Sequence, residues 1–131
     1  MTKDRILVVD DDAFCRELLA ELLELKYEML FAKDGYEALS ILSYQLDKVE
    51  AVLLDLMMPI MDGFGFITEF NSRGWNEKLP IIVVSSNDDE ESLVRCNEMG
   101  IKYFVSKPYD SDEASRIIGE AISDFRQAGL K

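Results

Sequence analysis

The sequence contains no histidine, and it has only two cysteines among its 131 residues. Without histidine, the chain has no imidazole for general acid–base catalysis and no histidine ligand for a metal ion. Cys15 and Cys96 lie far apart in the sequence and outside any CxxC pattern, which favours free thiols in a reducing compartment. We therefore expect a cytoplasmic protein in which oxygen atoms, and not imidazoles or thiolates, would bind a metal ion.

Basic residues and long apolar runs are also scarce. Lysine and arginine together number 14 against 26 acidic residues, which gives a formal net charge of -12. Such a surface repels nucleic-acid phosphates and anionic membranes. No apolar run approaches the length of a membrane span, and MTKDR is followed by only four apolar residues, so we expect no secretion signal. The length suits one domain with one core, which we place at residues 1–131.

Short apolar runs alternate with helical patterns along the chain. The runs expected to form strands are 6–9, 28–32, 51–54, 81–86 and 103–106. The segments expected to form helices are 14–25, 35–44, 64–70, 86–100 and 111–127. Regular alternation of strand and helix predicts an α/β fold with a parallel sheet and helices on both faces.

In the first helix we expect a broad apolar stripe made of Phe14, Leu18, Leu19, Leu22, Leu23 and Leu25. The pair Asp62–Gly63 is interpreted as a turn without chemistry.

Polar residues stand where the apolar runs end. They are Asp10, Asp11 and Asp12 after the first run, Asp55 after the third, Ser85 and Ser86 at the fourth, and Lys107 after the fifth. In parallel sheets, ligands bind beyond the carboxyl ends of the strands. Carboxylates that meet there repel one another unless their pKa values rise or a cation lies among them. Oxygen ligands favour a hard cation, best Mg²⁺, and this cation with a lysine and a hydroxyl could hold a phosphoryl group.

Asp55 is the best candidate for a nucleophile. Ser85 has no partner in a recognisable motif that would activate it, whereas a carboxylate can itself attack phosphorus and form an acyl phosphate. Asp55 stands alone on its strand, while Asp10 and Asp11 are adjacent, as a cation site requires.

The chain resembles the receiver domain of two-component response regulators. The resemblance is carried by ILVVDDDAFCRELL, VLLDLMMPIMDGFGF, PIIVVSS and YFVSKPY, and it extends over essentially the whole chain. The spacings from Asp55 to Ser85 and to Lys107 also suit that family. The resemblance implies a doubly wound sheet of five strands in the order 2-1-3-4-5, with five helices on its two faces.

The resemblance also implies roles for individual residues. Asp55 matches the phosphoacceptor. Asp10 and Asp11 match the acidic pair that holds Mg²⁺, for which Mn²⁺ can substitute, with Asp11 as the direct ligand and Asp10 acting mostly through water. The backbone carbonyl of Met57 matches a further metal ligand beside Asp55.

A second group of residues matches the phosphoryl-contacting and switch positions of the family. Ser85 matches the switch hydroxyl, and the backbone around Ser86 approaches the phosphoryl oxygens. Lys107 matches the lysine that contacts the phosphoryl group. Phe104 matches the aromatic residue that repacks on activation, and the adjacent Tyr103 should point to the opposite side of the strand.

Met57 and Asn87 occupy positions that tune the lifetime of the acyl phosphate in this family. An apolar Met57 should neither place nor activate a water molecule, so we expect a long-lived phosphorylated state.

The function implied is a phosphorylation switch and not an enzyme acting on other molecules. The phosphodonor would be a sensor histidine kinase or a histidine phosphotransfer protein. The fourth helix, fifth strand and fifth helix would form the surface for an output partner or for self-association.

Three alternatives fit less well. A phosphohydrolase with a DxD motif could use Asp10 and Asp12, but Phe14 stands where such motifs have Thr or Val, and the chain has no room for a cap domain. A flavodoxin-like cofactor module needs a phosphate loop after the first strand, where DDDAF repels phosphate. A receiver-like scaffold that accepts no phosphoryl group would not need all five key positions, which this chain retains. The sequence leaves open whether the domain acts alone or within a larger regulator.

Overall fold

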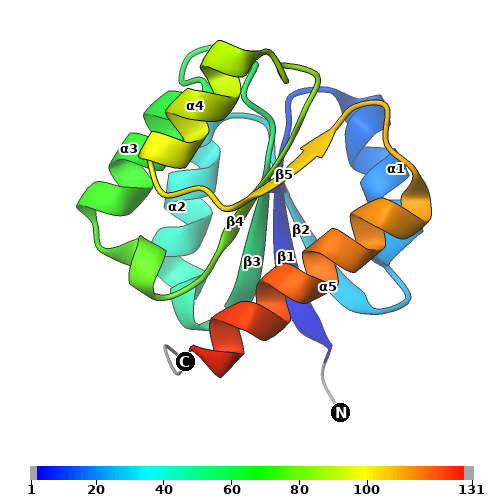
Figure 1. Cartoon of the computed structure of the whole chain (residues 1–131). Helices are drawn as coiled ribbons and strands as arrows, with labels where there is room; N and C mark the ends of the chain where they lie inside the picture. The colour runs from blue at the N-terminus through cyan, green and yellow to red at the C-terminus, as the bar shows by residue number, and fades with distance from the viewer. Residues whose placement is uncertain (1–2, 129–131) are drawn as a thin grey trace.

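The computed structural model describes residues 3–128, which form one five-stranded parallel sheet with helices on both faces (Figure 1). The strands are β1 (Asp4–Val9), β2 (Tyr27–Ala32), β3 (Val49–Leu54), β4 (Ile81–Ser85) and β5 (Tyr103–Ser106). Their order in the sheet is β2-β1-β3-β4-β5, and all four pairings are parallel. The expected fold class and strand order are therefore confirmed.

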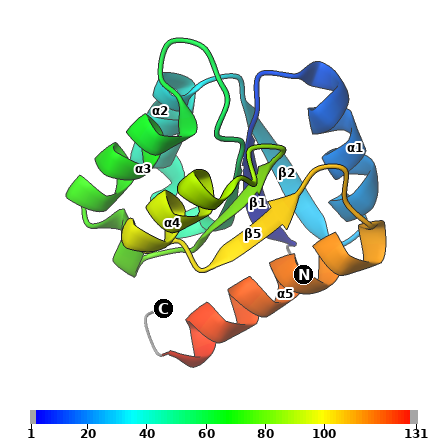
Figure 2. The same ribbon diagram turned by 45° about the horizontal axis from the view of Figure 1, so that its top comes forward.

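The helices form a layer on each face of the sheet. They are α1 (Ala13–Leu23), α2 (Gly35–Gln45), α3 (Gly63–Ser72), α4 (Glu90–Glu98) and α5 (Ser111–Gln127), with short 3-10 turns at η1 (Leu46–Lys48) and η2 (Trp75–Glu77). Figures 1 and 2 show α1 and α5 on one face and α2, α3 and α4 on the other. None of the helices in the described part of the chain has the length and apolar character needed to cross a lipid bilayer.

Each face of the sheet has its own apolar core, which explains the continuous apolar runs within β1, β3 and β4. In β1, Ile6 and Val8 pack in the core beneath α1 and α5, while Leu7 and Val9 pack in the core beneath α2, α3 and α4. Side chains alternate between the faces of a strand, so a strand covered on both faces must be apolar at every position. Polar residues in the central strands are therefore confined to their ends.

Aspartate side chains begin four of the helices. Each side chain accepts a hydrogen bond from a backbone N–H in the first turn of its helix. Asp12 accepts from the Phe14 N–H, Asp34 from the Glu37 N–H, Asp62 from the Gly65 N–H and Asp89 from the Ser92 N–H. An aspartate at this position satisfies a donor that the helix itself leaves unpaired. The Asp62–Gly63 pair, interpreted from the sequence as a turn, is thus the start of α3.

The expected apolar stripe of the first helix is only partly correct. Leu19 and Leu23 are buried, but Phe14 is 65% exposed, Leu18 is 40% exposed and Leu25 is 88% exposed. Leu25 lies beyond the end of α1 at Leu23, and a helix that packs on the sheet from one side buries only a narrow stripe of side chains. The apolar stripe in the sequence is therefore broader than the set of side chains that α1 buries.

Gly63 allows the loop after β3 to pass close to α3. A Cβ atom at this position would lie 2.6 Å from Leu56 Cα and 2.8 Å from the Asp55 carbonyl oxygen. We expect Gly63→Ala to lower the free energy of unfolding by about 2 kcal/mol, because the backbone must move to relieve the overlap. Gly119→Ala in α5 is the matched control, since a Cβ there has no neighbour within 4 Å. This control should raise the free energy of unfolding by roughly 0.5–1 kcal/mol.

Urea denaturation of both variants measures the difference. If Gly63→Ala unfolds at the same urea concentration as the unmodified protein, the close approach does not constrain the loop.

Candidate functional site

The carboxyl ends of β1, β3, β4 and β5 meet at one edge of the sheet, because these strands are neighbours. The backbone bonding continues just beyond them. The Asp55 N–H donates to the Val9 carbonyl at 3.0 Å, and the Lys107 N–H donates to the Ser85 carbonyl at 3.0 Å. These bonds fix Asp55 beside the end of β1 and Lys107 beside the end of β4.

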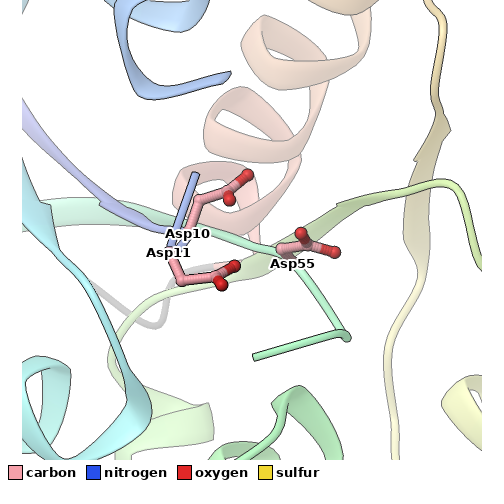
Figure 3. Close-up of side chains that lie close together, drawn as sticks. All are labelled: Asp10, Asp11 and Asp55. Carbon is pink, nitrogen blue, oxygen red and sulfur yellow. The ribbon is translucent and has the colours of Figure 1, made fainter. Parts of the chain in front are cut away.

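Three carboxylates gather at this edge. Oxygen atoms of Asp10, Asp11 and Asp55 lie within 4.8 Å of one another, and Figure 3 shows the three side chains together where β1 and β3 end. Asp10 is buried, with only 2% of its surface exposed, whereas Asp11 is exposed to solvent. The cluster therefore has one closed and one open side, and its oxygen atoms are ligands of the kind that a hard divalent cation prefers.

Lys107, the residue that directly follows β5, contacts two of the three carboxylates. Its Nζ lies 2.9 Å from Asp10 Oδ2 and 3.4 Å from Asp55 Oδ2, and its side chain is 17% exposed. Burial alone would lower the pKa of the Lys107 ammonium, but the hydrogen bond and charge of Asp10 and the charge of Asp55 raise it above its ordinary value. Lys107 is therefore positively charged and partly offsets the repulsion within the cluster.

Asp10 is the most constrained of the three acids. Burial raises the pKa of its carboxyl group, while a hydrogen bond from the Asp12 N–H and the hydrogen bond and charge of Lys107 oppose that rise. The Asp12 N–H lies 2.9 Å from Asp10 Oδ1. The Arg16 guanidinium donates to the Asp10 carbonyl oxygen at 2.8 Å. Asp10 is thus held by both its side chain and its backbone.

The other predicted site residues lie around this cluster. The buried hydroxyl of Ser85 accepts a hydrogen bond from the Asn87 N–H at 3.2 Å. The Met57 N–H donates to Asp55 Oδ1 at 3.3 Å, and the Met57 side chain is 60% exposed. Ser86 is exposed just after β4. The roles of these residues, including metal binding by the Met57 carbonyl, stay predictions.

Phe104 and Tyr103 point to opposite sides of β5, as expected. Phe104 is half-buried and packs against the core beneath α2, α3 and α4, whereas Tyr103 packs against the core beneath α1 and α5. The Tyr103 hydroxyl donates to Asp124 Oδ2 at 2.7 Å. Tyr103 is therefore bound to α5, and of these two aromatic residues Phe104 is the one that faces the side of the sheet carrying α4.

Three residues near the site were missed by the sequence analysis. Cys15 Sγ lies 3.4 Å from Lys107 Nζ, Arg16 binds the Asp10 carbonyl, and Gly63 lies against the Asp55 backbone. The first turn of α1 directly follows the three aspartates, so Cys15 and Arg16 could have been suspected from their position. Nothing in the sequence indicates that Cys15 faces a lysine 92 residues away.

Solved structures with this architecture are numerous. Vibrio cholerae chemotaxis protein CheY4 is 22% identical, with a TM-score of 0.82 over 92% of this chain and 99% of that one. The signal receiver domain of a putative Luxo repressor protein from Vibrio parahaemolyticus is 19% identical, with a TM-score of 0.88 over 98% and 96% of the two chains. At these identities the similarity shows the fold alone.

Sequence relatives and a family profile extend the comparison. The chain is 35% identical over 114 residues to the probable transcriptional regulator ycf27 of Porphyridium aerugineum, covering 86% of this chain and 45% of that protein. It is 37% identical over 110 residues to the response regulator MprA of Mycolicibacterium vanbaalenii, covering 83% and 46%. The chain thus spans about half the length of these curated relatives. Residues 6–118 match the profile of the response regulator receiver domain, and the chain belongs to this family of two-component signalling domains.

Proposed function

We propose that residues 1–131 form a phosphorylation-dependent switch in which Asp55 accepts a phosphoryl group from a phosphohistidine. The observation that carries this proposal is the Lys107 ammonium, which lies between Asp10 and Asp55 beside an open cluster of three carboxylates. A carboxylate oxygen of Asp55 forms a bond to phosphorus while the phosphorus–nitrogen bond of the donor breaks and its electron pair returns to the imidazole. The Lys107 ammonium then offsets the negative charge brought to Asp55.

The ligands proposed for Mg²⁺ are Asp10, Asp11, Asp55 and the backbone carbonyl of Met57. A bound Mg²⁺ would neutralise carboxylate and phosphoryl oxygens during transfer. The CheY of Borrelia burgdorferi, 25% identical to this chain, has been solved with CheX, BeF3 and Mg+2. The donor set, which contains only oxygen, and the exposed position of Asp11 support binding of the same cation here.

In the proposed switch, the new charge on Asp55 draws the Ser85 hydroxyl away from the Asn87 N–H. The backbone around Ser86 contacts the phosphoryl oxygens, and Phe104 repacks on the side of the sheet that carries α4. The exposed Leu93 and Val94 of α4 would then change their presentation to an output partner or to a second copy of the domain. A local charge thereby biases an element with two arrangements.

The phosphodonor in this proposal is a sensor histidine kinase or a histidine phosphotransfer protein, and the domain itself acts as a regulatory phosphoacceptor. The exposed, apolar Met57 and the neighbouring Asn87 would set a long lifetime for the acyl phosphate. Asp12 argues against a phosphohydrolase with a DxD motif, because its carboxylate already accepts the Phe14 N–H at 2.9 Å and begins α1.

Magnesium should stabilise the folded protein. At a Mg²⁺ concentration ten times the dissociation constant, we expect the free energy of unfolding to rise by about 1.4 kcal/mol. Asp11→Asn should lose most of this increment, whereas Asp12→Asn should keep it, because asparagine can also begin α1 and Asp12 is outside the cluster. Denaturation with and without MgCl2 measures the increment, and an equal loss in both variants would count against the proposed ligands.

Acetyl phosphate tests the phosphoacceptor directly. With Mg²⁺ present, intact-mass spectrometry should show the gain of one phosphoryl group, and Asp55→Ala should abolish that gain. Lys107→Met should slow it by about tenfold or more, since an ammonium that contacts the reacting carboxylate is lost. Phosphorylation that persists in Asp55→Ala would assign the acceptor to another residue.

Lys107 should help to keep Asp10 ionised. Because Lys107 opposes the effect of burial, Lys107→Met is expected to raise the pKa of Asp10 further above 3.8, and Lys102→Met, an exposed change before β5, should not. The folded protein holds this proton more tightly than the unfolded chain, so the contribution of Asp10 to the free energy of unfolding falls as the pH rises from 3.8 through the raised pKa. Carbon NMR titration of the aspartate carboxyl groups measures the pKa of Asp10 in both variants. An unchanged pKa of Asp10 in Lys107→Met would refute the coupling between the two residues.

A further inference from the structure

The Lys107 ammonium has a third contact that is chemically unlike the other two. Its Nζ lies 2.9 Å from Asp10 Oδ2 and 3.4 Å from Asp55 Oδ2, and also 3.4 Å from Cys15 Sγ in the first turn of α1. An ammonium has three N–H groups, so these contacts provide one acceptor for each. Two acceptors are carboxylates of the acid cluster, and the third is a thiol outside it.

The Cys15 thiol has a second polar partner besides Lys107, the carboxylate of Asp12. Cys15 Sγ lies 3.5 Å from Asp12 Oδ2, and Asp12 begins α1 by accepting the Phe14 N–H. Cys15 can thus donate its S–H to Asp12 while its sulfur accepts from Lys107. Burial raises the pKa of the Cys15 thiol, in keeping with a neutral S–H group at this position. Asp12 at the start of α1 thus contacts the Cys15 thiol, and the thiol in turn contacts the Lys107 ammonium.

The three acceptors would respond differently when the site is used. The carboxylates of Asp10 and Asp55 have less negative charge to offer Lys107 once they share it with a cation, and Asp55 changes its own charge on phosphorylation. The Cys15 thiol is neutral and is not one of the proposed ligands of the cation. Its contact with Lys107 therefore competes neither with cation binding nor with phosphorylation. Of the three contacts, this is the one that both states of the site can keep.

We propose that Cys15 is a positioning residue, which acts through Lys107 to hold the ammonium at the site when Asp10 and Asp55 engage a cation. This inference rests on the proposed function, and it assigns no chemistry to the thiol itself. Cys15 is suited to the task because it belongs to a helix whose start is fixed by Asp12. The weak thiol contact keeps the ammonium close while leaving it free to turn towards a phosphoryl oxygen.

Three variants separate the polar contact from packing. Cys15→Val keeps an apolar side chain but removes the acceptor and the donor, whereas Cys15→Ser restores both. Leu18→Ala is the packing control, because Leu18 lines the same groove of about 270 Å³ as Cys15 and Lys107 and is not among the contacts of the ammonium. Urea denaturation shows whether each variant is folded.

The first readout is the rate of phosphorylation by acetyl phosphate at saturating Mg²⁺. We expect Cys15→Val to be slower by about fivefold, while Cys15→Ser and Leu18→Ala stay within about twofold of the unmodified protein. Calorimetry should give the same Mg²⁺ affinity for all four proteins, since Cys15 is not a ligand. An unchanged rate in Cys15→Val, or an equal loss in Cys15→Ser, would overturn the proposal.

The second readout needs no phosphodonor. With Mg²⁺ bound, heteronuclear NMR of the lysine ammonium groups should show a slowly exchanging Lys107 signal in the unmodified protein and in Cys15→Ser, and its loss in Cys15→Val. Retention of this signal in Cys15→Val would overturn the proposal. If the unmodified protein gains no phosphoryl group, the proposed function fails, but the ammonium spectrum still decides whether Cys15 holds Lys107.

Discussion

The repulsion among three carboxylates at one edge of the sheet is the constraint on which the site depends. Parallel pairing of β1 with β3 places Asp10 and Asp11 beside Asp55, and oxygen atoms of the three side chains lie within 4.8 Å of one another. Lys107 reduces the repulsion in the absence of any ligand. The site is therefore stable enough to form, yet it retains excess negative charge that favours a cation.

The surrounding structure supports this arrangement without sharing in its chemistry. Two separate apolar cores hold the strands from both faces, and aspartates at the helix starts fix the loops that surround the site. Gly63 lets α3 begin directly against the Asp55 backbone. The neighbouring Asp12 shows how position decides role: it follows Asp10 and Asp11 in sequence, but its carboxylate begins a helix and is not part of the cluster.

The sequence was sufficient for the fold and for the clustering of the acids because both follow from simple rules. Apolar runs that alternate with helical patterns predict the sheet, and the ends of its strands must converge. The sequence was not sufficient for contacts that depend on how a helix is rotated against the sheet. The exposure of Phe14 and Leu18 and the approach of Cys15 to Lys107 all depend on the orientation of α1, which a stripe of leucines does not define.

The backbone bond between Lys107 and Ser85 has a mechanical consequence. Because the Lys107 N–H donates to the Ser85 carbonyl, the residue that contacts Asp55 and the last residue of β4 are joined to each other through their main chains. A displacement of the end of β4 is therefore passed to β5 without any side chain as intermediary. The same coupling extends along the strands, since β4 and β5 are paired from Ile82 to Ser85 and Phe104 lies opposite Val83.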